Sequence, residues 1–358
     1  MTYPDAPSTD APDATPTVSD EATAAPDGTP AETAPAKRRR WPKVVLIVGV
    51  ILVVLAAGGA IAGWQYVRHI DNSTVTHVDD LAQIPEQDRP VKTVTAAMNI
   101  LMLGSDSRNP ELDGSRTDTI ILAHVSADHK SAQLISIPRD TWVKIPKSAD
   151  GQHGGVTAKI NAAFAWGGIA LMTQTVESIT KVRIDHVAVI DFAGFAKVVD
   201  TIGGIDVTID KTFTSIHAPF RVFQAGRQHL NGEEALDYAR QRKQFSNGDF
   251  SRIEHQQQVL RAILNKATTA GILANPLKLS DFLQSCAQTL TVDRGFSVVD
   301  TAMDLRGISG DQLRFITNPS KGTGMVSGQS VVFADEAQDA ALYKAIADDT
   351  VKDWKATS

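Results

Sequence analysis

An uncharged stretch of 20 residues, from Val44 to Gly63, constrains what this chain of 358 residues can form more than any other feature. A helix of that length rises about 30 Å at ~1.5 Å per residue, which is enough to cross the hydrocarbon core of a membrane. The preceding segment, Lys37 to Lys43, is rich in Lys and Arg, and such clusters stay on the cytoplasmic side. We therefore predict a single-pass protein of the cell membrane, with a cytoplasmic N-terminus and an extracytoplasmic folded domain.

A cleaved signal peptide is the alternative, but its apolar core would normally be about 7–15 residues long and close to the N-terminus. The tail before the basic segment, Met1 to Ala36, is mostly Ala, Pro, Thr, Ser and acidic residues, so it is expected to be disordered. The predicted organisation is a tail with its basic segment at 1–43, the span at 44–63, a linker at 64–94, a catalytic domain at 95–325 and a C-terminal extension at 326–358.

Composition excludes several classes of function. Cys286 is the only cysteine, so the extracytoplasmic domain has no intrachain disulfide and depends on its hydrophobic core. The net charge of −6 argues against a nucleic-acid partner, which would require a clustered basic surface. The histidines are scattered, and no H-E-x-x-H, P-loop or G-x-S-x-G motif occurs, which disfavours zinc and the common hydrolase sites.

Hydrophobic patterns beyond the linker alternate between strands and helices. Short apolar runs and one stretch that alternates with period two predict strands. Glycines mark the C-terminal ends of predicted helices, and a capping-box-like pair, Asn231 and Glu234, marks the start of one. The predicted strands are 98–104, 119–125, 133–138, 185–190, 205–209 and a last one at 313–316. The predicted helices are 161–167, 169–180 and 192–202, followed by one that starts near residue 231. Helices are expected to dominate 249–305, and a terminal helix is expected within 335–358. This order indicates one α/β domain with helices on both faces of a sheet.

Two carboxylates flank neighbouring strands of that sheet. Asp106 follows the first strand and Asp118 precedes the second, so both are expected at one edge of the sheet. Converging carboxylates suit a divalent cation that also holds phosphate oxygens. Alternatively, each is a turn or cap residue.

Arginines make up the second group of candidates. Pro138 ends the third strand and exposes Arg139 and Asp140, which are alternatively a structural ion pair. Arg240 and Arg242 share a face if the preceding helix unwinds there, and Arg252 and Gln256 share a face at the start of the next helix. Helix N-termini and guanidiniums both favour anions such as phosphate, whereas arginines scattered over the surface would only solubilise the protein.

Six motifs in order give the chain a specific resemblance. They are Asn99 to Arg108, Arg116 to Thr119, Ile137 to Thr141, Lys159 to Ala163, His229 to Leu236, and Arg240 to Arg242 followed by Asp249 to Arg252 and Gln256 to Gln258. Together they resemble the LytR-CpsA-Psr family, from about Met98 to Pro319.

The resemblance implies a membrane-anchored enzyme with an α/β/α fold around a mixed central sheet. Such enzymes transfer a glycopolymer from a polyprenyl-pyrophosphate carrier to a hydroxyl of peptidoglycan and form a phosphodiester. It implies that Asp106 and Asp118 hold Mg²⁺ (or Mn²⁺), and that the pyrophosphate is bound by four arginines with help from Gln256. Those arginines are Arg139, Arg240, Arg242 and Arg252.

Three questions stay open at this level. Asp249 is the first choice for the base that accepts the hydroxyl proton, with Asp106 and Asp140 as substitutes. The prenyl chain needs an apolar pocket. The candidates to line it are Phe164, Phe192, Phe195, Val198 and Leu260, although core packing explains these residues equally well. The same site would also serve an extracytoplasmic polyprenyl-pyrophosphate hydrolase with water as acceptor, or a non-enzymatic regulator that only binds a lipid-linked ligand.

Overall fold

The structure is a computed structural model, and it describes residues 76–105, 117–242, 244–245, 247–269, 281–282, 284–285, 288–305, 308 and 312–356. The predicted span Val44 to Gly63 lies outside these residues, as do Asp106 and Cys286. Among the helices that are described, none has the length and apolar character needed to cross a membrane.

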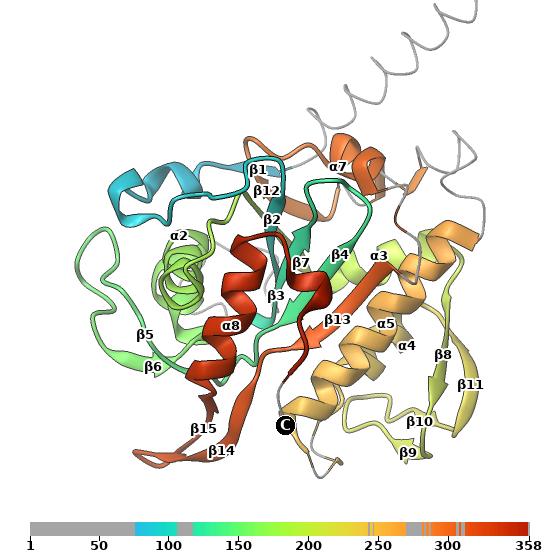
Figure 1. The fold of residues 1–358 in the computed structure, drawn as a ribbon. Helices are drawn as coiled ribbons and strands as arrows, with labels where there is room; N and C mark the ends of the chain where they lie inside the picture. The colour runs from blue at the N-terminus through green and yellow to red at the C-terminus, as the bar shows by residue number, and fades with distance from the viewer. Residues whose placement is uncertain are drawn as a thin grey trace, which may run out of the picture. The chain divides into compact units, whose positions relative to one another are not determined.

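A mixed sheet of seven strands forms the centre of the domain, in the order β1-β12-β7-β2-β3-β4-β13 (Figure 1). β2 pairs antiparallel with β3 and parallel with β7, and β3 pairs antiparallel with β4. The strands are β1 (Thr76–Val78), β2 (Met98–Ser105), β3 (Thr117–Val125), β4 (Ala132–Ser136), β7 (His186–Asp191), β12 (Leu290–Asp293) and β13 (Leu313–Thr317). The predicted α/β class with a mixed central sheet is confirmed.

Side chains of the sheet alternate between two apolar layers, because successive residues of a strand point to opposite faces. Leu101 and Leu103 of β2 pack in one layer with α2 (Asn161–Thr180) and α8 (Glu336–Ala347). Ile100 packs in the other, which includes residues of α5 (Asp249–Thr269) and α7 (Val298–Leu305). Figure 1 shows α2 and α8 on one side of the sheet and α3, α4 and α5 on the other.

A smaller core forms beside the second face of the sheet. It joins α3 (Phe192–Thr201), α4 (Gly232–Arg240) and α5 to the ladder of β8 (Ile205–Ile209) and β11 (Gly226–Leu230). Gly203 and Gly204, at φ 78° and 77°, end α3 in the conformation that glycine adopts without steric cost. Asn231 caps α4, and the predicted capping box with Glu234 is present in both directions.

Two parts of the sequence prediction are wrong. The stretch expected to be dominated by helices up to Leu305 contains β12, whose four residues are too short a run to show a period. The strand at 313–316 is not the last, because β14 (Ser320–Val326) and β15 (Gln329–Ala334) form a hairpin after it. The remaining short elements are β5 (Trp142–Lys144), β6 (Thr157–Lys159), β9 (Phe213–Thr214), β10 (Val222–Phe223) and the 3-10 turns η1 (Asp80–Gln83), η2 (Glu86–Asp88) and η4 (Val351–Asp353).

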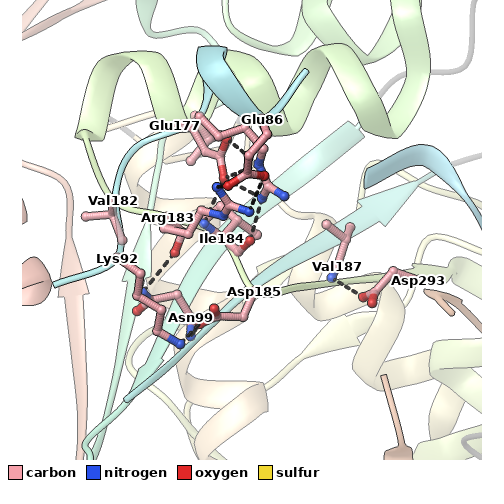
Figure 2. Close-up of polar contacts among 12 residues, drawn as sticks. Glu86, Lys92, Asn99, Glu177, Val182, Arg183, Ile184, Asp185, Val187 and Asp293 are labelled. Carbon is pink, nitrogen blue, oxygen red and sulfur yellow. Dashed lines mark hydrogen bonds and ion pairs between the residues drawn. The ribbon is translucent and has the colours of Figure 1, made fainter. Parts of the chain in front are cut away.

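Charged side chains attach the segment before β2 to the domain (Figure 2). Arg89 donates to Glu177 of α2 at 2.6 Å and to the backbone oxygen of Ile184 at 2.6 Å, and the two side chains are only 8% and 2% exposed. Nearby, Lys92 pairs with Asp185 at 2.8 Å. Residues 76–92 therefore form an ordered strap, which adds β1 to the sheet edge and is bound to the connection between α2 and β7.

Replacing Arg89 by Ala should destabilise the domain by about 3–5 kcal/mol, because it leaves the buried carboxylate of Glu177 without its charge partner. The matched control is Arg183→Ala, which breaks a pair with Glu86 whose carboxylate is 77% exposed and should cost at most about 1 kcal/mol. Urea unfolding of the two variants measures both free energies. Equal losses would contradict the assignment of the buried pair as the attachment of the strap.

Candidate functional site

The ends of β2, β3 and β4 meet at one edge of the sheet because β3 runs antiparallel to both neighbours. Ser105 at the end of β2 pairs with Thr117 at the start of β3, and β4 ends at the same edge. Asp118 and Arg139 are thereby brought together, and the guanidinium of Arg139 donates a short hydrogen bond to the carboxylate of Asp118. At this edge Gly104 has no room for a side chain, since a Cβ there would lie 2.9 Å from Cβ of Thr119.

The first turn of α5 adds an acidic and a basic side chain, Asp249 and Arg252, to this edge. Nη2 of Arg252 lies 2.7 Å from Oδ1 of Asp249, and Nη1 of Arg252 lies 3.9 Å from Oδ1 of Asp118. The same oxygen of Asp249 lies 3.7 Å from Nε of Arg139 and 3.8 Å from Nη1 of Arg242. Three guanidiniums therefore surround one carboxylate, and we call these five residues the arginine cluster.

Polar atoms in the arginine cluster are buried without hydrogen-bond partners among the described residues. They are Nε of Arg139, Nε of Arg252 and both carboxylate oxygens of Asp249. Asp249 lies close to its arginine partners, but the geometry of these ion pairs is not that of a hydrogen bond. Buried polar groups are normally satisfied, and exceptions often mark a site for a ligand. The cluster has three cations against two carboxylates. The neighbouring Asp140 lies 3.9 Å from Nε of Arg139 but is also paired with Lys159 at 3.1 Å, so one positive charge remains in excess and favours an added anion.

Burial dominates the pKa values of two groups in the cluster. It raises the pKa of Asp249 above its ordinary value of 3.8, although Arg252 and Arg139 act in the opposite direction. It lowers the pKa of Arg252, against the effect of Asp249. The carboxyl group of Asp249 therefore binds a proton more readily than that of an ordinary aspartate.

Arg240 and Arg242 point to different surroundings. α4 ends at Arg240, and Gln241 is extended at φ −67° and ψ 133°, which is the backbone that a shared face requires, yet the two guanidiniums do not come together. The side chain of Gln241 is fully buried and donates to Oδ1 of Asp237 at 2.6 Å, which fixes this turn. Arg242 joins the arginine cluster, whereas the guanidinium carbon of Arg240 lies 4.5 Å from the ring centre of Phe192.

An apolar cavity of about 210 Å³ lies next to the cluster, between the sheet and helices α3, α4 and α5. Arg240 and Gln256 line it together with apolar side chains of all three helices. Of the five apolar residues proposed from the sequence, four line this cavity: Phe192, Phe195, Val198 and Leu260. Phe164 is instead part of the core between the sheet and α2.

The structure thus unites Arg139, Arg242, Arg252, Asp118 and Asp249, and places Arg240 and Gln256 at the cavity. Asp106 lies outside the described residues, within which no group of three or more His, Cys, Asp or Glu side chains could hold a metal ion. Lys159 is a site residue that was not predicted from the sequence, and its amine lies 3.1 Å from Oδ1 of Asp140. Its place in a motif beside Asn161 was the only signal for it.

Comparison with known proteins decides the family. The model of the LytR_cpsA_psr family matches residues 66–347, which is most of the chain. The chain belongs to the LytR-CpsA-Psr family. It is 32% identical to the Bacillus cereus polyisoprenyl-teichoic acid–peptidoglycan teichoic acid transferase TagU over 260 residues, covering 70% of this chain and 80% of TagU. It is also 36% identical over 187 residues to TagV from Bacillus subtilis, a transferase of the same type, covering 51% of this chain and 47% of TagV.

The family's solved structures have the same fold. The crystal structure of Bacillus subtilis TagV superposes with a TM-score of 0.62 at 27% identity, covering 71% of this chain and 97% of that one. The chain spans about half the length of two curated relatives that it matches, 47% of TagV and 55% of the Corynebacterium glutamicum cell wall biosynthesis protein LcpA.

The carboxyl group of Asp249 should titrate above the ordinary value of 3.8 for an aspartate, because burial disfavours its charged form. Folding then favours the protonated form, so this group's contribution to stability falls as pH rises from its ordinary to its raised pKa. Asp206 is the control, since hydrogen bonds from His229 and Arg227 lower the pKa of this surface carboxyl. Carbon-13 NMR of the side-chain carboxyls measures both, and a midpoint for Asp249 at or below that of Asp206 would contradict the burial effect.

Proposed function

We propose that this protein transfers a glycopolymer from a polyprenyl-pyrophosphate carrier to a hydroxyl of peptidoglycan and forms a phosphodiester. The observation that carries the proposal is the position of the arginine cluster beside the apolar cavity, with Arg240 and Gln256 lining the cavity. A polyprenyl pyrophosphate has the same two parts, a dianionic or trianionic head and an apolar chain. The similarity to TagU and TagV, which are polyisoprenyl-teichoic acid–peptidoglycan teichoic acid transferases, supports the proposal.

The three guanidiniums of the cluster would hold the pyrophosphate. Arg139, Arg242 and Arg252 supply charge where negative charge increases on the transferring phosphoryl group, and their partial burial strengthens that effect. Arg240 and Gln256 would bind where the pyrophosphate meets the first isoprene unit. The cavity volume of about 210 Å³ is below the ~300–1,000 Å³ of typical ligand sites, so only the head-proximal part of the chain would enter it.

Asp249 would receive the proton of the attacking hydroxyl. Its carboxylate oxygens are buried and accept no hydrogen bond from a described residue, and burial raises its pKa, which makes it a stronger base than an ordinary aspartate. Asp140 lies within 4 Å of only one guanidinium of the cluster, Arg139, whereas Asp249 lies within 4 Å of three, so Asp140 is farther from the centre of the proposed pyrophosphate site and is the weaker candidate.

A divalent cation, Mg²⁺ or Mn²⁺, would be held by Asp118 together with Asp106. Carboxylate oxygens are the ligands such ions prefer, and Asp118 is 28% exposed at the sheet edge, where phosphate oxygens would also lie. Two protein carboxylates with substrate phosphates and water are a common set for Mg²⁺. The ion would neutralise charge on the pyrophosphate.

The span Val44 to Gly63 would anchor the protein in the cell membrane, with this site on the outer side. A polyprenyl-linked donor is itself anchored in that membrane, so the anchor confines enzyme and donor to the same surface.

Transfer of labelled glycopolymer from a lipid-linked donor to isolated peptidoglycan tests the function. Wild type should place the label on the wall, and Arg242→Ala should lower kcat/KM by about 10²–10³ because it removes charge stabilisation of the transition state. Arg227→Ala is the control, since its side chain is 78% exposed on the surface and should leave the rate unchanged. Label released into solution instead would show a hydrolase, and no turnover would favour a binding protein.

Chelation should abolish transfer, and added Mg²⁺ should restore it. Asp118→Asn should need about tenfold more Mg²⁺ for half-maximal rate, because a neutral amide is a poorer ligand for a hard cation. Asp128→Asn serves as control, since Asp128 lies in the turn after β3 and accepts from Ser126 at 2.7 Å. Full activity in excess chelator would contradict the metal assignment.

A further inference from the structure

A second recess borders the arginine cluster. It has a volume of about 500 Å³ and is lined by Arg139 and Arg242 of the cluster, by the β5–β6 hairpin, by the first turns of α2 and by Gln329 at the start of β15. We call it the β5–β6 groove. The β14–β15 hairpin is fixed beside it, because the backbone N–H of Val332 donates to the oxygen of Asp140 at 2.9 Å.

The β5–β6 groove and the apolar cavity lie on opposite faces of the sheet. The cavity is bounded by α3, α4 and α5, whereas the groove is bounded by α2, which covers the other face (Figure 1). No described residue lines both, and the cluster lies between them: Arg242 lines the groove and Arg240, two residues earlier, lines the cavity.

This arrangement has a consequence for displacement at phosphorus, in which the attacking and leaving oxygens are roughly in line. In the proposed transfer, a hydroxyl oxygen forms a bond to the phosphorus that carries the glycopolymer. The bond from that phosphorus to the bridging oxygen breaks, the bridging oxygen leaves with the polyprenyl phosphate, and the hydroxyl proton passes to a base. With the prenyl chain in the cavity, the leaving oxygen faces the cavity, so the nucleophile arrives from the groove.

We infer, given the proposed function, that the β5–β6 groove binds the acceptor glycan strand of peptidoglycan and presents its hydroxyl to the arginine cluster. The lining fits sugar rings, which combine apolar C–H faces with a rim of hydroxyls. Trp142 and Trp166 provide apolar surface with a polar N–H, and Asn161 and Gln329 provide donors and acceptors. A volume of about 500 Å³ is in the usual range for a bound ligand of a few rings, ~300–1,000 Å³.

Filling the groove tests the inference through binding alone. Thr157 is exposed on β6 and lines the groove, so Thr157→Trp should occupy it without disturbing the core. Thr208→Trp is the matched control, because Thr208 is an exposed strand residue of β8 outside the groove. Isothermal titration of the full-length chain measures affinity for a soluble peptidoglycan tetrasaccharide, for geranylgeranyl pyrophosphate and for the lipid-linked glycopolymer.

Thr157→Trp should weaken tetrasaccharide binding about tenfold or more and leave geranylgeranyl pyrophosphate binding within about twofold. Gln329→Ala, which only removes polar atoms from the groove, should weaken tetrasaccharide binding in the same direction, and Thr208→Trp should change neither affinity. An unchanged tetrasaccharide affinity in Thr157→Trp would overturn the inference. So would selective loss of the lipid-linked glycopolymer, which would assign the groove to the donor's sugars.

These binding results are independent of turnover. A chain that binds the tetrasaccharide in the groove but transfers no label to the wall would refute the proposed transferase and keep the glycan site. A chain that transfers label at the wild-type rate and KM for peptidoglycan when the groove is filled would refute the groove and keep the transferase.

Discussion

Three guanidiniums around one buried carboxylate are the constraint on which the rest of the site depends. Arg139, Arg242 and Arg252 lie within 4 Å of Asp249, and among the described residues the carboxylates of Asp118 and Asp140 also lie within 4 Å of a guanidinium of the cluster. Removing charges from water costs several kcal/mol per ion unless each is paired and hydrogen-bonded. Here the charges are paired, but hydrogen bonding among the described residues is incomplete, with buried polar atoms of Arg139, Arg252 and Asp249 left without a partner. An anion with several oxygens would complete it, which is why a pyrophosphate fits this site better than a neutral ligand.

The charged side chains of the arginine cluster stay close together because different strands and helices of the fold position them. Asp118 is fixed by β3, Arg139 by the end of β4, and Arg252 by the first turn of α5, while the buried Gln241 fixes the turn before Arg242. Because the cluster is at the sheet edge, each face of the sheet offers it a different neighbour. One face supplies an apolar cavity and the other a polar groove. Donor and acceptor can therefore approach one phosphorus from opposite sides without competing for the same surface.

Much of the fold was predictable from the sequence because its signals are local. The apolar runs of β2 to β4, the glycines after α3 and the capping box of α4 all depend on neighbouring residues. β12 was missed because four residues show no period, and its place is set by pairing with β1, over 200 residues away in the chain. The site residues were recognisable by type and motif. The separation of Arg240 from Arg242 was not, because it depends on tertiary contacts, those of Arg240 with Phe192 in α3 and of Arg242 with Asp249 in α5.

In the proposed function, the arginine cluster binds a pyrophosphate whose prenyl chain enters the apolar cavity. A crystal structure of the protein with geranylgeranyl pyrophosphate and Mg²⁺ would test both contacts at once. We expect density for the pyrophosphate within hydrogen-bond distance of Arg139, Arg242 and Arg252, with the first isoprene units beside Phe192 and Leu260. Pyrophosphate density away from these arginines, or a prenyl chain lying in the β5–β6 groove, would contradict it.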